Sequence, residues 1–373
     1  MRAVPLAFYA PMKSPSHPSP SGDRTMARLL FKALAQAGFK PEVASELRTW
    51  DRAGDAAFQA EARQASHEEA DRLVARWSGG GGPRLWFTYH IYYKAPDWIG
   101  PRVADTLGIP YVVAEGSRAG KRAAGPWALG HAGAEAALDR ADAVFVMTEV
   151  DREGLERHRP ERQRLLDLPP FLDLGEWNSS QAPAQTRRED RSSVRLLTVA
   201  MMRRGDKLES YGILAKALAQ AADEAWTLDV AGDGEAQDEV RKLFADFGPR
   251  VTFRGRLDGA ALAHLYAAAD LLVWPAVNEA YGMVLLEAQA FGCPVLACRY
   301  GGVASVVREA ETGVLTPPGD DAAFADALSR LLRDGPYRRA LGEGAYAFVT
   351  QERGLDQAAV RMRDGLMPLL PER

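Results

Sequence analysis

Cysteine is scarce in this sequence, with two residues, Cys293 and Cys298, among 373. Two cysteines cannot build the disulfide framework of a small secreted domain, and no metal-ligand spacing accompanies them. Cysteines that flank a short apolar run are usually small core residues. We therefore expect both to be buried, in a protein of a reducing compartment.

Long apolar runs and a strong excess of one charge are lacking as well. No run approaches the roughly 20 residues of a membrane-spanning helix, and 46 basic against 50 acidic residues give a formal net charge of -4. That balance indicates no general attraction to nucleic acid. The first ten residues are interrupted by Pro5 and favour a first strand over a signal sequence. We expect a cytoplasmic protein.

A group of arginines raises the alternative of peripheral contact with the inner face of a membrane: Arg152, Arg157, Arg159, Arg162 and Arg164. Acidic residues are interleaved with them, which is more typical of a solvated helix with weak surface ion pairs. The oligomeric state is left open by the sequence.

Apolar strand-like runs alternate with helix-like stretches along the chain, whose length fits two domains of ordinary size. This alternation predicts an α/β protein with parallel sheets that helices cover on both faces. The expected strands are Val4–Tyr9, Leu85–Tyr89, Tyr111–Ala114, Val144–Thr148, Arg195–Ala200, Thr227–Ala231, Val251–Arg254, Leu271–Trp274 and Val295–Ala297. The expected helices of the first half are Arg24–Ala37, Ala56–Trp77, Asp97–Leu107 and Trp127–Arg140.

The stretch between the two halves is polar and nearly free of large apolar residues, which is typical of a linker. We therefore expect a first domain over residues 1–173, a linker over residues 174–193 and a second domain over residues 194–350.

Two glutamates, Glu279 and Glu287, lie in a segment that combines a buried strand, a glycine turn and a helix start. Gly282 lets the backbone turn before the helix. The first amides of that helix, at Met283 and Val284, lack partners within the helix and can donate to ligand oxygens. Because sugar hydroxyls donate well to carboxylates, Glu279 is a candidate for binding a sugar ring and Glu287 for a ribose diol. The alternative is a loop charge and a solvated helix face.

A cationic loop follows the strand expected at residues 195–200 and opens a helix. It contains Arg203, Arg204 and Lys207. Cations beside a helix start can neutralise phosphate oxygens, so this loop is a candidate diphosphate site. The alternative is an ordinary basic surface loop.

Two residues of the first half follow strand ends, where open parallel sheets bind ligands. Gly22 opens a helix and would let a phosphate approach the backbone, although Asp23 and Arg24 beside it fit helix caps equally well. His90 follows the second expected strand and is a candidate for ligand contact. The alternative is an interior histidine whose hydrogen bonds are made within the protein.

Further polar and aromatic residues lie close to these positions. The polar segment from Glu115 to Arg122 also follows a strand, and it is a candidate for part of an acceptor pocket or for binding an anionic acceptor. Several aromatic side chains are candidates for stacking on sugar faces, with packing as the commoner alternative: Tyr89, Tyr92, Tyr93 and Trp98.

The second half resembles the retaining family-4 glycosyltransferases, which have the two-domain GT-B fold. The resemblance is dense from about Val194 to Asp320 and looser before it, and it is specific for the family rather than the substrate. Besides the segment with the two glutamates, it is carried by Val230-Ala-Gly-Asp-Gly-Glu, Val251-Thr-Phe-Arg-Gly-Arg-Leu, Leu265-Tyr-Ala-Ala-Ala-Asp-Leu-Leu-Val, Gly301-Gly-Val-Ala-Ser-Val-Val and Glu311-Thr-Gly-Val-Leu-Thr-Pro-Pro-Gly-Asp.

The resemblance implies two Rossmann-like, doubly wound parallel-sheet domains that face each other across a cleft. It also implies that the last helix crosses back onto the first domain, which would involve residues 351–373. For the diphosphate, Lys207 matches the family's lysine, whereas Met201 occupies the usual arginine position. Arg203 or Arg204 must therefore substitute, and the sequence does not choose between them.

The remaining roles also follow from the resemblance. Glu279 would position the donor sugar with the amides of Gly282 to Val284, and Glu287 would bind the ribose. The base would lie against backbone near Arg256 and Leu257. His90 matches a histidine that the family often places near the reacting sugar. Gly22 stands in a loop where the family often has two glycines, and it is assigned to the diphosphate.

Together these roles imply a retaining glycosyltransferase that moves a sugar from a nucleotide-diphosphate sugar to an acceptor hydroxyl. Its catalytic residues would be Glu279, His90 and Lys207. Bacterial-type polysaccharide, glycolipid or glycoconjugate synthesis is the expected setting, with a carbohydrate or lipid-linked acceptor. GT-B enzymes commonly need no metal, and the nearest Asp-x-Asp-like pattern, at residues 233–235, is better explained as a turn. We expect no cofactor and no metal.

Two other functions stay open on the sequence. One is a nucleotide-sugar epimerase or hydrolase on the same fold. The other is a sugar-nucleotide-binding protein that has lost transfer, for which the missing arginine at position 201 and the altered glycine loop leave room. Turnover of the donor separates the binding protein from the enzymes, and an acceptor requirement separates a transferase from an epimerase.

Overall fold

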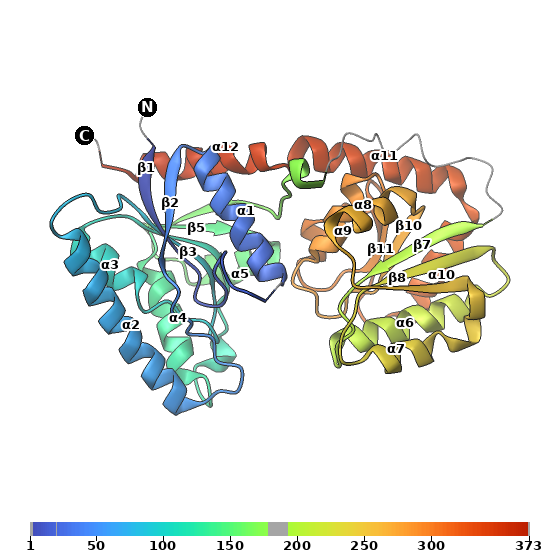
Figure 1. Cartoon of the computed structure of the whole chain (residues 1–373), viewed down its shortest axis with the longest axis horizontal. Helices are drawn as coiled ribbons and strands as arrows, with labels where there is room; N and C mark the ends of the chain where they lie inside the picture. The colour runs from blue at the N-terminus through green and yellow to red at the C-terminus, as the bar shows by residue number, and fades with distance from the viewer. Residues whose placement is uncertain (1–2, 20, 178–192, 372–373) are drawn as a thin grey trace. The chain divides into compact units, whose positions relative to one another are not determined.

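The computed structural model describes residues 3–19, 21–177 and 193–371. Most of the expected linker, residues 178–192, lies outside this described part. The chain forms two compact units, one made of Met1–Pro169 with Leu355–Arg373 and the other of Pro170–Gly354 (Figure 1).

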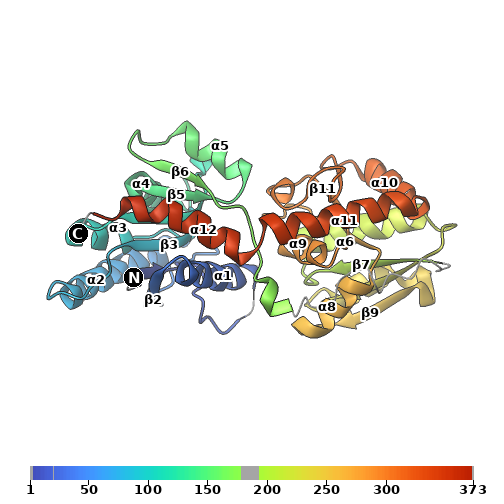
Figure 2. The same cartoon turned by 90° about the horizontal axis from the view of Figure 1, so that it is seen from above.

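The first unit is built on a six-stranded parallel sheet with the order β2-β1-β3-β4-β5-β6. Its strands are β1 (Val4–Tyr9), β2 (Phe39–Ser45), β3 (Trp86–Ile91), β4 (Tyr111–Gly116), β5 (Ala143–Val146) and β6 (Arg164–Asp167). Its helices are α1 (Gly22–Gln36), α2 (Ala56–Trp77), α3 (Gly100–Leu107), α4 (Ala128–Arg140), α5 (Glu149–Arg157) and α12 (Leu355–Leu366). The helices α2, α3 and α4 pack together, and α12 lies along α1 (Figure 2).

The second unit repeats this plan, with the sheet order β12-β11-β10-β7-β8-β9. Its strands are β7 (Val194–Val199), β8 (Trp226–Ala231), β9 (Val251–Gly255), β10 (Leu271–Trp274), β11 (Val295–Cys298) and β12 (Gly313–Thr316). Its helices are α6 (Asp206–Gln220), α7 (Gln237–Leu243), α8 (Gly259–Ala268), α9 (Met283–Ala290), α10 (Asp321–Arg333) and α11 (Gly335–Glu352). In Figure 1, α6, α7 and α10 lie on one side of this sheet and α8, α9 and α11 on the other.

Each sheet contains one place where the direction of strand addition reverses. In the first unit it lies between β1 and β3, and in the second between β7 and β10. Helices on opposite faces diverge at such a point, so the carboxyl ends of the two strands border an opening for a ligand. The loops after these four strands are therefore the places to look for function.

Each of the nine expected strands is present, within a few residues of its expected bounds, and so are the four expected helices of the first half. Both cysteines are buried, as expected. The sequence reading missed β2, β6 and β12, each of which lies at an edge of its sheet. The expected helix at the end of the chain needs correction, because Gln351 belongs to α11 and α12 runs only from Leu355 to Leu366. Across the described ranges, no helix is long and apolar enough to cross a membrane.

Candidate functional site

The clearest candidate site lies at the reversal point of the second unit, where the loops after β7 and β10 leave the sheet. Lys207, in the first turn of α6, forms an ion pair with Glu279 on the loop after β10. Their side chains are only 23% and 19% exposed, so solvent screens this pair less than an ordinary surface pair. The Lys207 ammonium also lies 5.5 Å from the ring centre of Trp274. The fold thus joins two residues that the sequence assigned to separate motifs.

The loop that carries Glu279 is held in an unfavourable backbone conformation. Ala276 and Asn278 have positive φ angles of 59° and 49°, which residues with a side chain rarely adopt. Helix α6 holds them there, because the Val277 amide donates to the Ser210 hydroxyl and the Asn278 side chain donates to Asp206, both at 3.0 Å. Such strain is typical of segments whose shape serves function.

Two glycines fix the position of Glu279. Gly282 has a φ angle of +73° directly before α9, and a Cβ there would lie 3.2 Å from the Glu279 side chain. Gly301 has a φ angle of +47°, and its Cβ would lie 2.2 Å from the Glu279 carbonyl oxygen, a distance at which atoms collide. The Gly302 amide donates to the Ala280 carbonyl at 2.6 Å. The turn between β10 and α9 therefore depends on Gly301 and Gly302 as well as on Gly282.

The expected phosphate-binding positions lie on the same edge of the sheet. Met283 and Val284 occupy the first turn of α9, as expected, and both are partly buried. Of the two candidate arginines, Arg204 contacts Glu239 of α7 at 2.9 Å. Arg203 is exposed and has no ion-pair partner within the described ranges. Arg203 is therefore the one whose guanidinium is available to a diphosphate.

The Gly-Asp-Gly turn after β8 supports the cationic loop through backbone contacts. A Cβ at Gly232 would lie 1.9 Å from the Ala200 carbonyl oxygen, and one at Gly234 would lie 2.3 Å from that of Met202. The Met202 amide also donates to the Asp233 carbonyl at 2.8 Å. The motif thus shapes the segment that leads to Lys207.

Glu287 lies one turn into α9 and accepts a hydrogen bond of 2.8 Å from the hydroxyl of Tyr266 in α8. Burial raises the pKa of Glu287 to about 7, although the hydrogen bond from Tyr266 acts in the opposite direction. The Tyr266 ring packs in turn against Trp177 and Phe291, with ring centres 5.9 and 5.8 Å away. Arg256 and Leu257 lie on the loop that leads into α8.

Sequence reasoning missed Tyr266 and the support that Gly301 gives to Glu279. A signal for each was present, because both residues stand in motifs that carry the family resemblance. What the motifs could not show is which catalytic or binding side chain each one holds.

The pKa of Glu287 and its expected contact with a ribose predict that nucleotide binding depends on pH. Ribose hydroxyls donate to the ionised carboxylate, so affinity should rise as the pH increases through about 7 and fall as Glu287 becomes protonated below it. Glu287→Gln should flatten this rise, and Tyr266→Phe should move its midpoint to higher pH. Calorimetric titration of one nucleoside diphosphate between pH 6 and 8.5 measures this. The Gln variant serves as the control, since ionisation of the ligand's own phosphate affects both proteins alike. Identical profiles for both would contradict the ribose assignment.

The corresponding edge of the first unit holds His90 at the end of β3. Its Nδ1 lies 3.2 Å from the Asp23 carboxylate, and its Nε2 lies 3.8 Å from that of Glu115. His90 and Glu115 both have positive φ angles, 63° and 60°. Gly22 opens α1 beside Asp23, and a Cβ there would meet no atom within 4 Å. The predicted residues Gly22 and His90 thus border the reversal point between β1 and β3, with open space beside the glycine.

The charge of His90 is set by its carboxylate neighbours. Burial alone would lower its pKa, but the charge of Glu115 and the hydrogen bond and charge of Asp23 outweigh burial and raise the pKa of His90 to about 9. Burial in turn raises the pKa of Glu115. Burial also acts to raise the pKa of Asp23, but the hydrogen bond and the charge of His90, with smaller contributions, together outweigh it and lower that pKa. At neutral pH His90 is therefore an imidazolium.

This raised pKa predicts a pH-dependent stability. Because the folded-state pKa of His90 exceeds the usual value of 6.5, its ion pairs stabilise the fold fully below pH 6.5, and this stabilisation is lost as the pH rises through about 9. His90→Asn should therefore lower the melting temperature at pH 6 and have much less effect at pH 10. The same substitution at the exposed His264 should have little effect at either pH. If the difference in melting temperature between wild type and His90→Asn is as large at pH 10 as at pH 6, the assignment of a positive charge to His90 is wrong.

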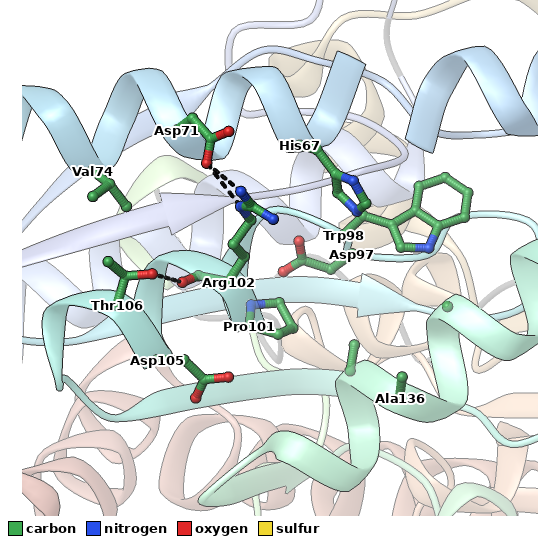
Figure 3. Close-up of a pocket in the computed structure, with 12 residues that line it drawn as sticks. His67, Asp71, Val74, Asp97, Trp98, Pro101, Arg102, Asp105, Thr106 and Ala136 are labelled. Carbon is green, nitrogen blue, oxygen red and sulfur yellow. Dashed lines mark hydrogen bonds and ion pairs between the residues drawn. The ribbon is translucent and has the colours of Figure 1, made fainter. Parts of the chain in front are cut away.

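A cavity of about 570 Å³ lies elsewhere in the first unit, among α2, α3 and α4 (Figure 3). Asp71 and Arg102, which line this cavity, form an ion pair with each other. None of the residues predicted to bind the donor or to take part in catalysis lines it. Trp98, a candidate platform for a sugar, faces this cavity, and Tyr89 is only 1% exposed. Tyr92, Tyr93 and Trp98 are the partly exposed rings of that group.

Two of the five arginines that raised the possibility of membrane contact pair with acidic neighbours. Arg152 pairs with Glu156 and Asp167, and Arg162 pairs with Asp142. Within the described chain these contacts give the surface around α5 a mixed charge.

A family profile and curated relatives that match this chain are all of glycosyltransferases. The profile described as "Glycosyl transferases group 1" matches residues 185–348. A D-inositol 3-phosphate glycosyltransferase from Frankia alni is 30% identical over 73% of this chain and 72% of its own length. One from Corynebacterium glutamicum is 30% identical over 56% of this chain. The chain spans about half the length of the first such relatives, 53% in this case.

Solved structures are similar over nearly the whole chain. A sucrose-phosphate synthase from Thermosynechococcus elongatus gives a TM-score of 0.75 at 23% identity and covers 98% of this chain and 99% of its own. The Anabaena protein HepE, in complex with UDP, gives a TM-score of 0.72 at 17% identity, over 97% and 99%. These likenesses confirm the expected GT-B fold. Taken with the matching profile and the Frankia relative, they show that the chain belongs to the glycosyl transferases of group 1.

Proposed function

We propose that the chain is a retaining glycosyltransferase that moves a sugar from a nucleotide-diphosphate sugar to an acceptor hydroxyl. The observation that carries this proposal is the Lys207–Glu279 ion pair at the reversal point of the second unit, beside the first turn of α9. A cation and free helix amides suit a diphosphate, and a carboxylate suits sugar hydroxyls. A sugar diphosphate needs both within a few ångströms of each other.

Each residue of the second unit then has a role in donor binding. Lys207 and Arg203 would neutralise the diphosphate together with the amides of Met283 and Val284. Glu279 would accept hydrogen bonds from the transferred sugar, and Glu287 would accept them from the ribose. The roles of His90 near the reacting sugar, of Gly22 beside the diphosphate and of Arg256 and Leu257 near the base stay predictions from the family resemblance.

The reaction balances without an external acid or base. The bond between the anomeric carbon and the phosphate oxygen breaks, and its electron pair leaves with the nucleoside diphosphate. A bond forms between the anomeric carbon and the acceptor oxygen on the same face, which retains the configuration. The departing phosphate oxygen takes the proton of the acceptor hydroxyl. Lys207 stabilises the charge that develops on the leaving group, the type of electrostatic assistance that contributes most to such steps.

A donor and acceptor panel tests the proposal. Nucleoside diphosphate release would be measured for a set of nucleotide sugars, beginning with UDP-sugars, with and without candidate polyol, carbohydrate and lipid-linked acceptors and with and without EDTA. We expect one donor to be consumed and the release to require an acceptor. Release without any acceptor would favour a hydrolase or epimerase. Binding of a nucleotide without turnover of any donor would favour a sugar-nucleotide-binding protein.

A further inference from the structure

Two cations at the carboxyl edge of the first unit's sheet have no part in the donor chemistry. Lys94 follows β3, and Arg122 follows β4 in the short 3-10 turn Gly120–Arg122. Both lie over the same two rings. The Lys94 ammonium is 5.7 Å from the centre of Tyr93 and 5.1 Å from that of Trp127, and the Arg122 guanidinium is 5.2 Å from each. The loops after two neighbouring strands thus bring two positive charges onto one aromatic surface.

Neither cation has a carboxylate partner within the described part of the chain, and the Nε of Arg122 is buried without a hydrogen-bond partner there. Arg118, only four residues earlier, pairs with both Glu135 and Asp139. Like charges repel, and a buried guanidinium nitrogen that makes no hydrogen bond costs free energy. A ligand with a negative charge would relieve both effects.

A buried polar network holds the segments that carry the two cations. The Asp51 carboxylate accepts from the amides of Ala53, Gly54 and Asp55 and from the Gln59 side chain. Gln59 also donates to the Pro126 carbonyl at 2.8 Å, and the Asp51 amide donates to the Lys94 carbonyl at 2.8 Å. Because Asp51 already has four donors, it serves as a support for this arrangement and does not act as a counter-ion.

A row of aromatic rings connects the two cations with His90. The ring of His90 stacks on Tyr92 at 4.9 Å, Tyr92 contacts Tyr93 at 5.5 Å, and Tyr93 contacts Trp127 at 5.7 Å between ring centres. Partly exposed aromatic rings are suitable surfaces for the apolar faces of sugars and polyols.

We propose that Lys94 and Arg122 bind an anionic group of the acceptor, a phosphate monoester or a carboxylate, while Tyr93 and Trp127 hold the two cations in place. This inference rests on the proposed function, because it assigns the anion to the acceptor. An ammonium and a planar guanidinium together supply up to eight donors, and the guanidinium can bind two oxygens of one anion at once. The row of rings would carry the acceptor's carbon skeleton towards His90.

The signal of the Arg122 Nε–H group in nitrogen-15 NMR spectra tests the site directly. It is assigned by its loss in Arg122→Lys and is followed during titration with inorganic phosphate, glucose 6-phosphate, glucuronate and glucose. We expect saturable shifts with the anions and none with glucose, and the relative response to phosphate and carboxylate identifies the group that the site prefers. To silence the proposed donor site, the titrations use an Arg203→Ala, Lys207→Ala background.

Lys94→Met keeps an unbranched stem of similar length over the rings but removes the charge, so it should weaken the response by about tenfold or more. Arg76 provides a matched control, because it lies over the ring of Trp77 at 5.9 Å and no anion site is proposed there. The Nε–H signal of Arg76 should show no saturable shift in the same anion titrations. The proposal would be overturned if none of the three anions shifted the Arg122 signal. It would also be overturned if the signal responded equally in Lys94→Met, or if it shifted no more than the Arg76 signal.

A transfer assay separates this inference from the proposed function. With the wild-type donor site, Lys94→Met should raise KM for an anionic acceptor by about tenfold or more and leave KM for its neutral counterpart unchanged. Anion binding at Arg122 without any donor turnover would leave the anion site in place and count against the transferase. Donor turnover without anion binding at Arg122 would support the transferase and count against the anion site.

Discussion

Replacing Lys207 by alanine is expected to lower kcat/KM for the donor by about 100- to 1,000-fold, the usual effect of removing one donor group that stabilises the charge of a transition state. Two causes act together. The departing diphosphate loses a cation, and Glu279, only 19% exposed, loses its ion-pair partner. The fall should appear in kcat as well as KM, because the charge on the leaving group grows as the bond breaks.

A control for this experiment lies on the same helix. Lys216 is 72% exposed and lies 3.7 Å from Asp321, so Lys216→Ala should leave the kinetics nearly unchanged. Thermal melting of both variants shows whether the fold is intact. A Lys207→Ala enzyme with wild-type kinetics would mean that the ion pair at the end of β10 is structural and that the donor binds elsewhere.

Gly301→Ala is expected to abolish most donor binding without touching any group that contacts the donor. The new Cβ would lie 2.2 Å from the Glu279 carbonyl oxygen, so the loop after β10 must move. Its strained shape has few alternatives, and a displacement of about 1 Å is enough to spoil a binding geometry. We expect the Kd for the donor to rise by at least about tenfold, which is about 1.4 kcal/mol.

Gly319→Ala separates the clash from backbone strain. Gly319 also has a positive φ, +76°, but its Cβ would meet no atom within 4 Å. Both variants should lose some stability, since alanine is unfavourable in the left-handed region, but only Gly301→Ala should weaken donor binding. Calorimetric titration and thermal melting of the two proteins test this. Equal donor affinities would show that the glycine loop does not position Glu279.

Two of the three strands that the sequence failed to predict share a physical cause. Edge strands pair on one side only, so they need less apolar character, and β2 contains Lys40, Pro41 and Glu42. β6 begins with Arg164 and ends with Asp167, with two leucines between them. β12 is buried and no shorter than β10 and β11, which were predicted, so this cause does not apply to it. The central strands, which helices cover on both faces, gave the strongest signal.

The same distinction applies to the site. Residue type, position relative to a strand end and the family resemblance together selected Lys207, Glu279 and Glu287 as candidates. The preference for Arg203 over Arg204 rests on Glu239, a residue of another helix that local patterns cannot place. The shared aromatic surface of Lys94 and Arg122 was hidden for the same reason, because their loops follow different strands.

The order of the chain has a consequence for its synthesis. The chain leaves the first unit at Pro169 and returns to it at Leu355, so the second unit is encoded between two parts of the first. Helix α12 buries Met362 and Leu366, and Gly365 packs closely against Phe145 and Leu166. As the ribosome releases the chain, the second unit can therefore complete its core while the first still exposes the surface that awaits α12. A nascent chain halted before residue 355 would present that apolar surface to chaperones, although its second sheet is already complete.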